Sequence, residues 1–341
     1  MQLSSLLSIF AILASAIAIP KPNIMIATGD VGQNGFQLLR VNFANTTSPY
    51  TSIGSVLNNW ILVQGDATAF DYTNKIYYAV LNAADSNGPI YGNSSLFAFN
   101  AITGSINWKY NFPFNYTMGA MAYEPKLGQI VGLCGQLVAG NYTVQGYCGI
   151  TPPSANNPVP IFQLIQNWDY TLMYDPDTRA LDPINHHYYH RLYNNTWMPD
   201  YFCTFNSLTG ELLNTAQFSS PEFSGTRWNI GTNQLFSICN ADAGLDLCEV
   251  DPVTGNFNPL NVFDRMHQSD ELFAASAVID PIANIYYLEV DFADDGFFTR
   301  AVDINNQSST YGTIIANYSI PTRNYFPSNY HVYSTADDLS E

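Results

Sequence analysis

One stretch of this chain recurs several times at intervals of about fifty residues. In each copy a strand-like run ends at a polar residue, a short turn follows, and a second run begins. The copies are TAFDYTNKIYYAVL from Thr68, MAYEPKLGQIVGL from Met121, ALDPINHHYYHRL from Ala180, RWNIGTNQLFSI from Arg227 and AVIDPIANIYYLEV from Ala277. Their polar anchors are Asp71, Glu124, Asp182, Asn229 and Asp280. A repeat of this length is typical of the blades of a β-propeller.

A second motif follows within most copies and predicts a tight turn. It reads LFAFNAITG from Leu96, YFCTFNSLTG from Tyr201 and DLCEVDPVTG from Asp246. The Asn or Asp side chain caps such a turn, and the glycine supplies its positive φ. The longer stretch LFAFNAITGSINW, which ends at Trp108, resembles the PQQ-like (quinoprotein-type) propeller repeat.

That resemblance covers nearly all of the mature chain and implies a propeller fold. Enzymes of the quinoprotein family generally hold their cofactor in an eight-bladed ring, over a disulfide between adjacent cysteines. This chain has no two adjacent cysteines and fewer repeats. The resemblance therefore implies neither bound PQQ nor dehydrogenase activity, because a fold alone does not carry a function.

Counting the copies predicts six four-stranded blades, with seven as the alternative. The first blade has only three strands near the N-terminus: IMIATGD from Ile24, FQLLRVNF from Phe36 and YTSIGSVL from Tyr50. The segment NYHVYST from Asn329 would supply its missing innermost strand and close the ring. Closure removes exposed sheet edges that would otherwise template aggregation. We therefore expect a single all-β domain, a β-propeller over residues 19–341.

Residues 1–18 have the features of a secretory signal peptide. An apolar run over residues 3–19 ends at Pro20 and Lys21, and Ala16 and Ala18 form an A-x-A cleavage pattern. The run is shorter than the ~20 apolar residues of a membrane span. Secretion also fits the Asn-x-Ser/Thr sequons, which are glycan acceptors in exported proteins. These sequons begin at Asn45, Asn93, Asn115, Asn141, Asn194, Asn306 and Asn317.

The five cysteines fit an oxidising compartment as well. Cys134 and Cys148 flank one turn, and Cys239 and Cys248 flank another, so we predict two local disulfides. Cys203 is left over. We expect it to be a buried free thiol, with an intermolecular bridge as the alternative.

The charge of the chain limits its partners. Lys and Arg number 11 against 28 Asp and Glu, which gives a net charge of −17. Such a chain cannot bind nucleic acid by releasing counterions from the phosphate backbone, and it is poorly suited to anionic lipid. Calcium ions and cationic partners remain compatible with this charge.

The segment NHHYYH at residues 185–190 holds three of the five histidines. Aligned on the repeat, it occupies the second strand of the fourth blade, with His186 and His190 on one face and His187 on the other. His186 and His190 would lie about 13 Å apart along a strand, too far for both to bind one zinc ion. We therefore predict packing and hydrogen bonding for this cluster.

Two acidic segments are candidates for a metal or ligand site. CNADAGLDLC places Asn240, Asp242 and Asp246 at alternating positions, and oxygen ligands of this kind suit calcium. An Asx-rich hairpin turn is the alternative. DFADDGFF, with Asp291, Asp294 and Asp295, falls in the equivalent loop one blade later, with a solvated acidic turn as the alternative. Calcium is the one candidate cofactor that these oxygen ligands suit, although no calcium motif fixes either assignment.

Loop positions predict where a partner would bind. The loops between second and third strands, and those between blades, lie on one rim of a propeller. Four sequons map there in the second to fourth blades, while the matching loops of the other blades are acidic. The acidic residues of this rim are Asp30, Asp242, Asp246, Asp270, Glu271, Asp291, Asp294 and Asp295.

These features predict a secreted, glycosylated binding module whose partner is an extracellular protein or glycan. The alternative is a calcium-dependent hydrolase of lactonase or esterase type, in which channel carboxylates hold the ion and activate water. No G-x-S-x-G, H-E-x-x-H, G-x-G-x-x-G or Walker A motif occurs, so the sequence leaves open whether the protein is an enzyme.

Overall fold

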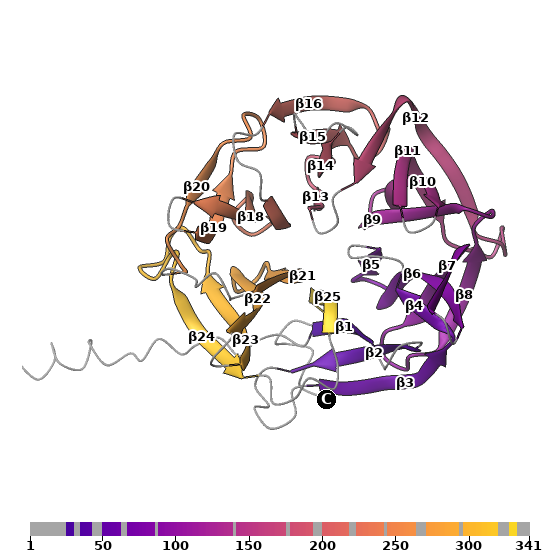
Figure 1. Cartoon of the computed structure of the whole chain (residues 1–341), viewed down its shortest axis with the longest axis horizontal. Coiled ribbons are helices and arrows are strands. Elements are labelled where there is room, and N and C mark those ends of the chain that lie inside the picture. Colours follow the sequence, from indigo (N-terminus) through magenta and orange to yellow (C-terminus); the bar gives the residue numbers. More distant parts are fainter. Residues whose placement is uncertain are drawn as a thin grey trace, which may run out of the picture.

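The protein is an all-β ring of sheets around a central axis (Figure 1). The computed structural model describes residues 25–30, 35–42, 50–62, 67–85, 88–138, 141–174, 178–193, 200–217, 223–241, 244–263, 271–292, 296–319 and 327–332. The predicted signal peptide lies outside these ranges. The described residues form 25 strands, and they contain no helix that could cross a membrane.

The first sheet joins the two ends of the described chain. Its strand order is β25-β1-β2-β3, with β1 at Met25–Asp30, β2 at Gly35–Val41, β3 at Tyr50–Asn58 and β25 at Pro327–Val332. β25 runs antiparallel to β1, and Met25 lies opposite Val332. This is the strand pairing that the sequence predicts for the two ends.

The second sheet has a divided inner edge. Its members are β4 at Trp60–Leu62, β5 at Thr68–Asp71, β6 at Ile76–Asp85, β7 at Gly88–Asn100 and β8 at Ile106–Asn111. Both β4 and β5 pair with β6: Ile61 lies opposite Asn82, and Phe70 lies opposite Tyr77. β5 therefore forms the strand nearest the axis.

The third sheet is longer than expected. It contains β9 at Tyr116–Glu124, β10 at Gln129–Val138, β11 at Asn141–Thr151, β12 at Ile161–Tyr174, β13 at Ala180–Asp182, β14 at His187–Tyr193, β15 at Asp200–Asn206 and β16 at Leu212–Gln217. The end of β12 pairs with β11 on one side and with β14 on the other, where Tyr174 lies opposite Leu192. The prediction of separate four-stranded sheets is therefore wrong here, because both edges of β12 are paired.

Two four-stranded sheets complete the ring, so the described chain has five sheets rather than six. One contains β17 at Phe223–Asn229, β18 at Gln234–Ala241, β19 at Gly244–Val250 and β20 at Phe257–Pro259. The other contains β21 at Glu271–Asp280, β22 at Ile285–Phe292, β23 at Gly296–Asp303 and β24 at Ile314–Ser319.

Pairs of tyrosines in the second strands pack the sheets against one another. Tyr77, Tyr78, Tyr188, Tyr189, Tyr286 and Tyr287 are all buried. The Tyr188 hydroxyl donates a hydrogen bond to the carbonyl of Ala120, and Tyr286 does the same to Gly225 at 2.6 Å. Both acceptors lie at bulges with positive φ in the innermost strand of the preceding repeat. A buried tyrosine thus contributes apolar area and satisfies its hydroxyl at once.

Both predicted disulfides are present. Cys134–Cys148 and Cys239–Cys248 link neighbouring antiparallel strands, with Cα separations of 5.8 and 6.0 Å. Cys203 is a buried free thiol, as expected. Burial raises its pKa to about 12, so the reactive thiolate is scarce at neutral pH.

Candidate functional site at the turn rim and the central cavity

The polar anchors of the repeat are buried caps of the turns that follow the innermost strands. Asp182 shows the pattern: its Oδ1 accepts hydrogen bonds from the backbone N–H groups of Ile184 and Asn185 at 2.9 and 3.2 Å. Asp71, Glu124, Asn229 and Asp280 cap their own turns in the same way. All five anchors are at most 1% exposed. The four carboxylates and the Asn229 amide are therefore structural, because buried polar and charged groups need such hydrogen-bond donors.

Each of these turns ends in a left-handed residue four positions after its anchor. The residues are Lys75, Gly128, His186, Asn233 and Asn284, with φ between 53° and 61°. This conformation is common for glycine and tolerated by Asn and His. It orients a backbone carbonyl toward the next turn of the same blade: that of His186 accepts from Ser207 N–H at 2.8 Å, and that of Asn284 from Ile304 N–H at 2.9 Å.

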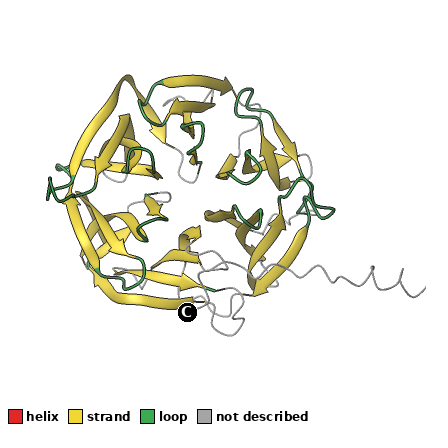
Figure 2. Cartoon of the chain, turned by 180° about the vertical axis from the view of Figure 1, so that it is seen from behind, coloured by secondary structure: helices red, strands yellow, loops and turns green. Residues whose placement is uncertain are grey.

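Neighbouring turns touch, so they share one face of the ring. Asn229 Nδ2 donates to Asn284 Oδ1 at 3.0 Å, and the Lys126 amine lies 3.2 Å from the His186 ring. We call this face the turn rim; it comprises the turns 72–75, 125–128, 183–186, 230–233 and 281–284 with the adjoining third-to-fourth-strand turns (Figure 2). The other face is called the opposite rim.

Exposed apolar side chains stand at the tips of these turns. These apolar tips, with their exposed fractions, are Tyr72 (54%), Ile102 (56%), Leu127 (36%), Ile184 (61%), Ile230 (41%), Val253 (70%) and Ile282 (65%). Single exposed apolar residues are ordinary on protein surfaces. Here seven of them lie in the turns of one rim, and a concentration of exposed apolar side chains on one face is typical of an interaction site.

The sequence interpretation missed the apolar tips, although a signal was available. Ile184 and Ile282 lie in Asp-Pro-Ile, and Val253 lies in Asp-Pro-Val. A branched apolar residue directly after a turn-capping Asp-Pro has no core to enter, since the turn carries it into solvent. Its recurrence in several repeats was the observation that could have located this surface.

A cavity of about 260 Å³ lies on the axis of the ring, within the turn rim. The innermost strands β5, β9, β13, β17 and β21 contribute to its wall, together with β25. Tyr72, Pro125 and Pro183 line it at the level of the turns, next to the apolar tips. We call it the central cavity. It connects the exposed turn rim with the deeper residues of the inner strands.

Two arginines and a histidine are the basic residues that line the central cavity. Arg179 is almost fully buried and donates hydrogen bonds to the carbonyl and hydroxyl oxygens of Thr68. Arg227 donates to the carbonyl oxygens of Ala277 and Thr226, both at 2.7 Å. Burial and the two neighbouring guanidinium groups hold the pKa of His331 well below its ordinary value, so its ring is neutral at pH 7.

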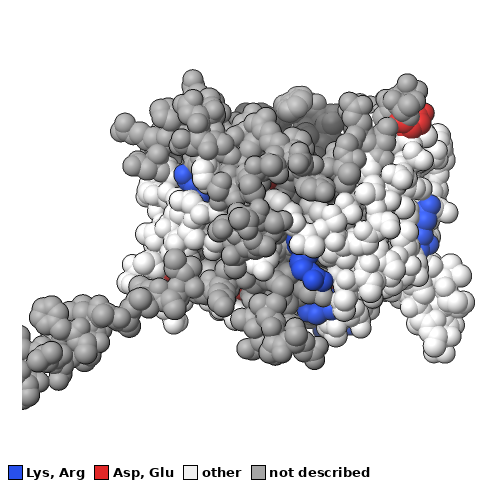
Figure 3. Space-filling model, turned by 90° about the horizontal axis from the view of Figure 1, so that it is seen from below, with Lys and Arg blue, Asp and Glu red and all other residues white. Residues whose placement is uncertain are grey.

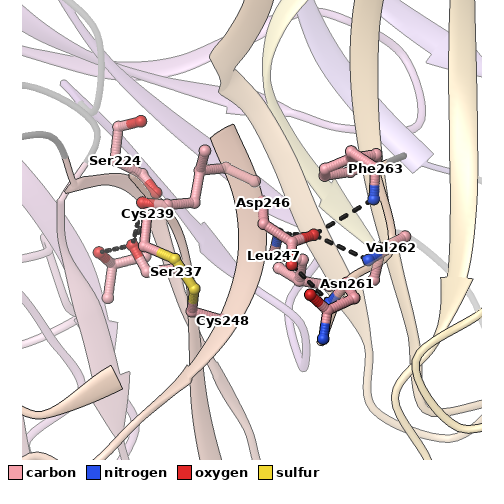
Figure 4. The surroundings of a disulfide bond; sticks show 11 residues. Ser224, Ser237, Cys239, Asp246, Leu247, Cys248, Asn261, Val262 and Phe263 are labelled. Carbon is pink, nitrogen blue, oxygen red and sulfur yellow. Dashed lines mark hydrogen bonds between the residues drawn. A yellow bond between two sulfur atoms is a disulfide. The ribbon is translucent and has the colours of Figure 1, made fainter. Parts of the chain in front are cut away.

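The predicted acidic rim is only partly within the described residues, and Asp246 differs from the prediction. Asp246 is buried, and Figure 4 shows its carboxylate between its hydrogen-bond donors. Its Oδ1 accepts from the N–H groups of Leu247, Val262 and Phe263, at 2.8, 2.8 and 3.2 Å, and its Oδ2 from Asn261 at 2.5 Å. This carboxylate anchors the segment that follows β20, so it adds no exposed charge to the rim.

The predicted calcium ligands do not all share a face. Asn240 lies opposite Leu245, and Asp246 lies opposite Cys239, so the side chains of Asn240 and Asp246 leave opposite faces of the sheet. Asp242, Asp270, Asp294 and Asp295 lie outside the described residues, as do the side chains of Asp30, Glu271 and Asp291. Among the residues that are described, no group of three His, Cys, Asp or Glu could hold a metal ion.

The histidine cluster is divided between a turn and a strand. His186 lies in the β13–β14 turn, where its ring is 3.5 Å from the carboxylate of Glu124. His190 is buried in β14, with Nδ1 at 2.6 Å from the carbonyl of Arg191. The prediction that His186 and His190 share one face of a strand is wrong, because the left-handed turn places His186 outside the strand.

Four of the sequon asparagines can be placed with their side chains. Asn93 is exposed in the first half of β7, and Asn115 lies nearby, where its N–H donates to the carbonyl of Gly92 at 3.0 Å. Both are at the end of their sheet remote from the turn rim. Asn306, in the β23–β24 turn, and Asn317, in β24, are exposed as well. Asn45 and Asn194, and the side chain of Asn141, lie outside the described residues.

No protein-family model matches the sequence, and no curated protein matches it. Solved structures share the fold. A chain in a nidogen/laminin complex is 11% identical over 91% of this chain and 98% of its own length, with a TM-score of 0.58. The periplasmic gluconolactonase PpgL of Pseudomonas aeruginosa is 9% identical over 88% of this chain and 84% of its own, with a TM-score of 0.54. At such identities the likeness shows one thing: the chain has a single β-propeller fold.

Proposed function

We propose that this protein is a secreted, glycosylated binding module that takes an extracellular protein ligand at its turn rim. The single observation that carries the proposal is the set of seven apolar tips in the turns of the turn rim. In this proposal the eight-stranded sheet acts as two blades, and the β25–β1 pairing closes a six-bladed ring. The two disulfides support an oxidising compartment.

The apolar tips favour a protein over a glycan as the ligand. Branched aliphatic side chains such as Ile184, Val253 and Ile282 gain free energy mainly by being covered with apolar surface. A protein interface supplies such surface at its centre. Sugar binding instead relies on polar groups and flat aromatic rings, and among the tips only Tyr72 offers a ring.

The positions of the described sequons support the same rim. Asn93 and Asn115 lie away from it, so glycans there would leave the cavity mouth open. Asn306 is in an outer turn of the last sheet, where a glycan would border the surface without covering the axis. The predicted acidic rim stays a second hypothesis for the docking face.

One similar structure supports a protein ligand. The similar chain in the nidogen/laminin complex belongs to a protein–protein complex, which fits a propeller that binds a protein. The gluconolactonase neighbour is nearly as similar, so the calcium-dependent hydrolase stays the alternative. The geometry favours it less, because Asp71, Asp182 and Asp280 all use their carboxylates to cap turns.

Selection of displayed random peptides on the purified protein tests the proposal. Enriched peptides should bind the wild type and lose at least about tenfold in affinity on the triple variant Ile184→Ser, Val253→Ser and Ile282→Ser, since each tip buries apolar area in the complex. The matched control is Ile90→Ser, Phe114→Ser and Leu164→Ser, which removes exposed apolar residues that lie away from the turns of the turn rim. Equal losses in both variants, or a loss in the control alone, would contradict the proposal.

A further inference from the structure

We propose that the central cavity binds the carboxylate of an acidic side chain that the protein ligand inserts from the turn rim. The inference rests on the proposed function and deepens it, because it names the chemical group that enters the axis of the ring. It is carried by the convergence of Arg179 and Arg227, from different sheet regions, on one cavity.

The central cavity is basic, although the chain as a whole is acidic. The whole protein carries a net charge of −17, with only 11 Lys and Arg, yet two arginines line this one cavity. A guanidinium group is always charged, and its planar fork matches the two oxygens of a carboxylate. Both arginines are oriented by backbone carbonyls, those of Thr68 and Ala277, so their positions are fixed before a ligand arrives.

The arginine charges in the central cavity are not cancelled by a direct hydrogen bond to Asp71. Asp71 also lines the cavity, but its carboxylate accepts from the N–H groups of Thr73 and Asn74 and from the Asn74 side chain. Burial, followed by the two guanidinium groups, lowers the pKa of the His331 ring, which lines the same cavity, so the positive charge of the arginines acts on the wall of the cavity. Low-dielectric walls strengthen such a field for an entering anion.

The size of the central cavity narrows the choice of ligand further. Cavities that hold small-molecule ligands usually measure about 300–1,000 Å³. The central cavity, at about 260 Å³, is smaller than this range. It fits an Asp or Glu side chain with a few waters better than it fits a large metabolite. Tyr72, Pro125 and Pro183 line it at the level of the turns, so the acidic residue would enter flanked by apolar neighbours.

The surroundings also argue against a polyanion such as a sulfated glycan. A polyanion needs an extended basic surface. On the side of the molecule shown in Figure 3, the described Lys and Arg form small separate groups. A single anion site bordered by apolar side chains instead matches one acidic side chain on an otherwise apolar protein surface.

Acetate tests the carboxylate site without the protein ligand. Trp228 lines the central cavity, so its indole N–H signal in a ¹⁵N spectrum is the reporter, assigned by Trp228→Phe. Acetate should shift this signal beyond the effect of chloride at equal ionic strength. Arg227→Gln should weaken acetate binding about tenfold, as expected for a charge-assisted hydrogen bond. Lys109→Gln, which removes one exposed positive charge from β8, should leave it unchanged.

Equal acetate affinity in a folded Arg227→Gln, or no shift beyond that of chloride in the wild type, would overturn the inference. If near-ultraviolet circular dichroism shows that Arg227→Gln is unfolded, the acetate titration is repeated with Arg227→Lys. Lysine keeps the charge but loses the fork, so weaker acetate binding supports the site and wild-type affinity overturns it.

The selected peptides separate this inference from the proposed function. They should carry Asp or Glu between apolar residues and lose affinity both in the triple serine variant and in Arg227→Gln. Peptides that lose affinity in the triple serine variant but bind Arg227→Gln as tightly as the wild type would overturn the inference and leave the function intact. Acetate binding with no peptide dependence on the tips would overturn the function and leave the anion site intact.

Discussion

Both rims of the ring are held by buried carboxylates, but the two kinds of anchor work over different distances in the sequence. On the turn rim, Asp182 binds N–H groups two and three residues ahead. On the opposite rim, Asp246 binds N–H groups 15 to 17 residues ahead, across the whole of β20. Each turn of the turn rim is thus capped by a residue of its own, with further contacts to the neighbouring turn, whereas the segment 261–263 of the opposite rim is held by one side chain that is distant in the sequence.

The difference explains where a stable binding surface can form. A hairpin that caps itself tolerates an apolar residue at its tip, because the fold of the turn does not depend on that residue. Ile184 and Ile282 are therefore free to serve binding. The segment held by Asp246 has no such independence, since its backbone donors rely on one distant side chain.

The largest effect is expected at Asp246. Asp246→Ala leaves the buried N–H groups of Val262 and Phe263, and the N–H of the exposed Asn261, without their acceptor, which should lower the free energy of unfolding by about 3 kcal/mol or more. Chemical denaturation measures this loss. Asp246→Asn keeps one acceptor oxygen and should cost less. A loss below that of the turn-rim variants would break the comparison between the two rims.

The next effect concerns the Cys239–Cys248 disulfide beside Asp246. It closes a loop over a separation of 9 residues, so Cys239→Ser with Cys248→Ser should cost about 2–3 kcal/mol by chain entropy. Denaturation of this double variant, with Cys203 intact, gives the value. An unchanged stability would show that the sheet alone orders this hairpin.

A smaller effect is expected at the turn rim. Asp182→Ala should cost about 1 kcal/mol, the usual contribution of a capping side chain. Asp182→Asn should be close to neutral in thermal unfolding, because Asn229 already fills the same position in another repeat. A large loss for the asparagine variant would show that the charge, and not the cap, holds the turn.

The smallest effect is a pH dependence at the exposed outer turn of β19–β20. Hydrogen bonds from the Thr254 hydroxyl and the Val253 N–H lower the pKa of Asp251 below its ordinary value. A lowered pKa stabilises the fold above pH 4, and this contribution is lost as the pH falls through the folded-state pKa. The difference in Tm between the wild type and Asp251→Asn should therefore shrink below pH 4. A difference that grows there would contradict the assignment.

The sequence predicts features whose partners are local. The anchors Asp71, Asp182 and Asp280, the tyrosine pairs and both disulfides follow from the repeat and from hairpin spacing. The joining of β12 to β14 does not, because it depends on which edge of β12 remains open once the ring has formed. The Asp246 contacts are hidden for the same reason.

The central cavity is the least predictable feature. Arg179, Arg227 and His331 belong to segments far apart in the sequence, and they meet only when the inner strands surround the axis. Composition misleads here, since a net charge of −17 directs attention to the carboxylates. The acidic residues were therefore the natural candidates, although the described channel carboxylates serve the fold.

Hydrogen–deuterium exchange of the protein with and without a selected peptide tests the choice of rim most directly. If the ligand binds at the turn rim, bound peptide should slow exchange in the turns 72–75, 183–186 and 281–284, where neighbouring hairpins surround the central cavity. Exchange in residues 240–246, 270–271 and 291–295 should not slow. Slowed exchange in those acidic segments, with unchanged exchange in the turns, would place the ligand on the opposite rim and contradict the account.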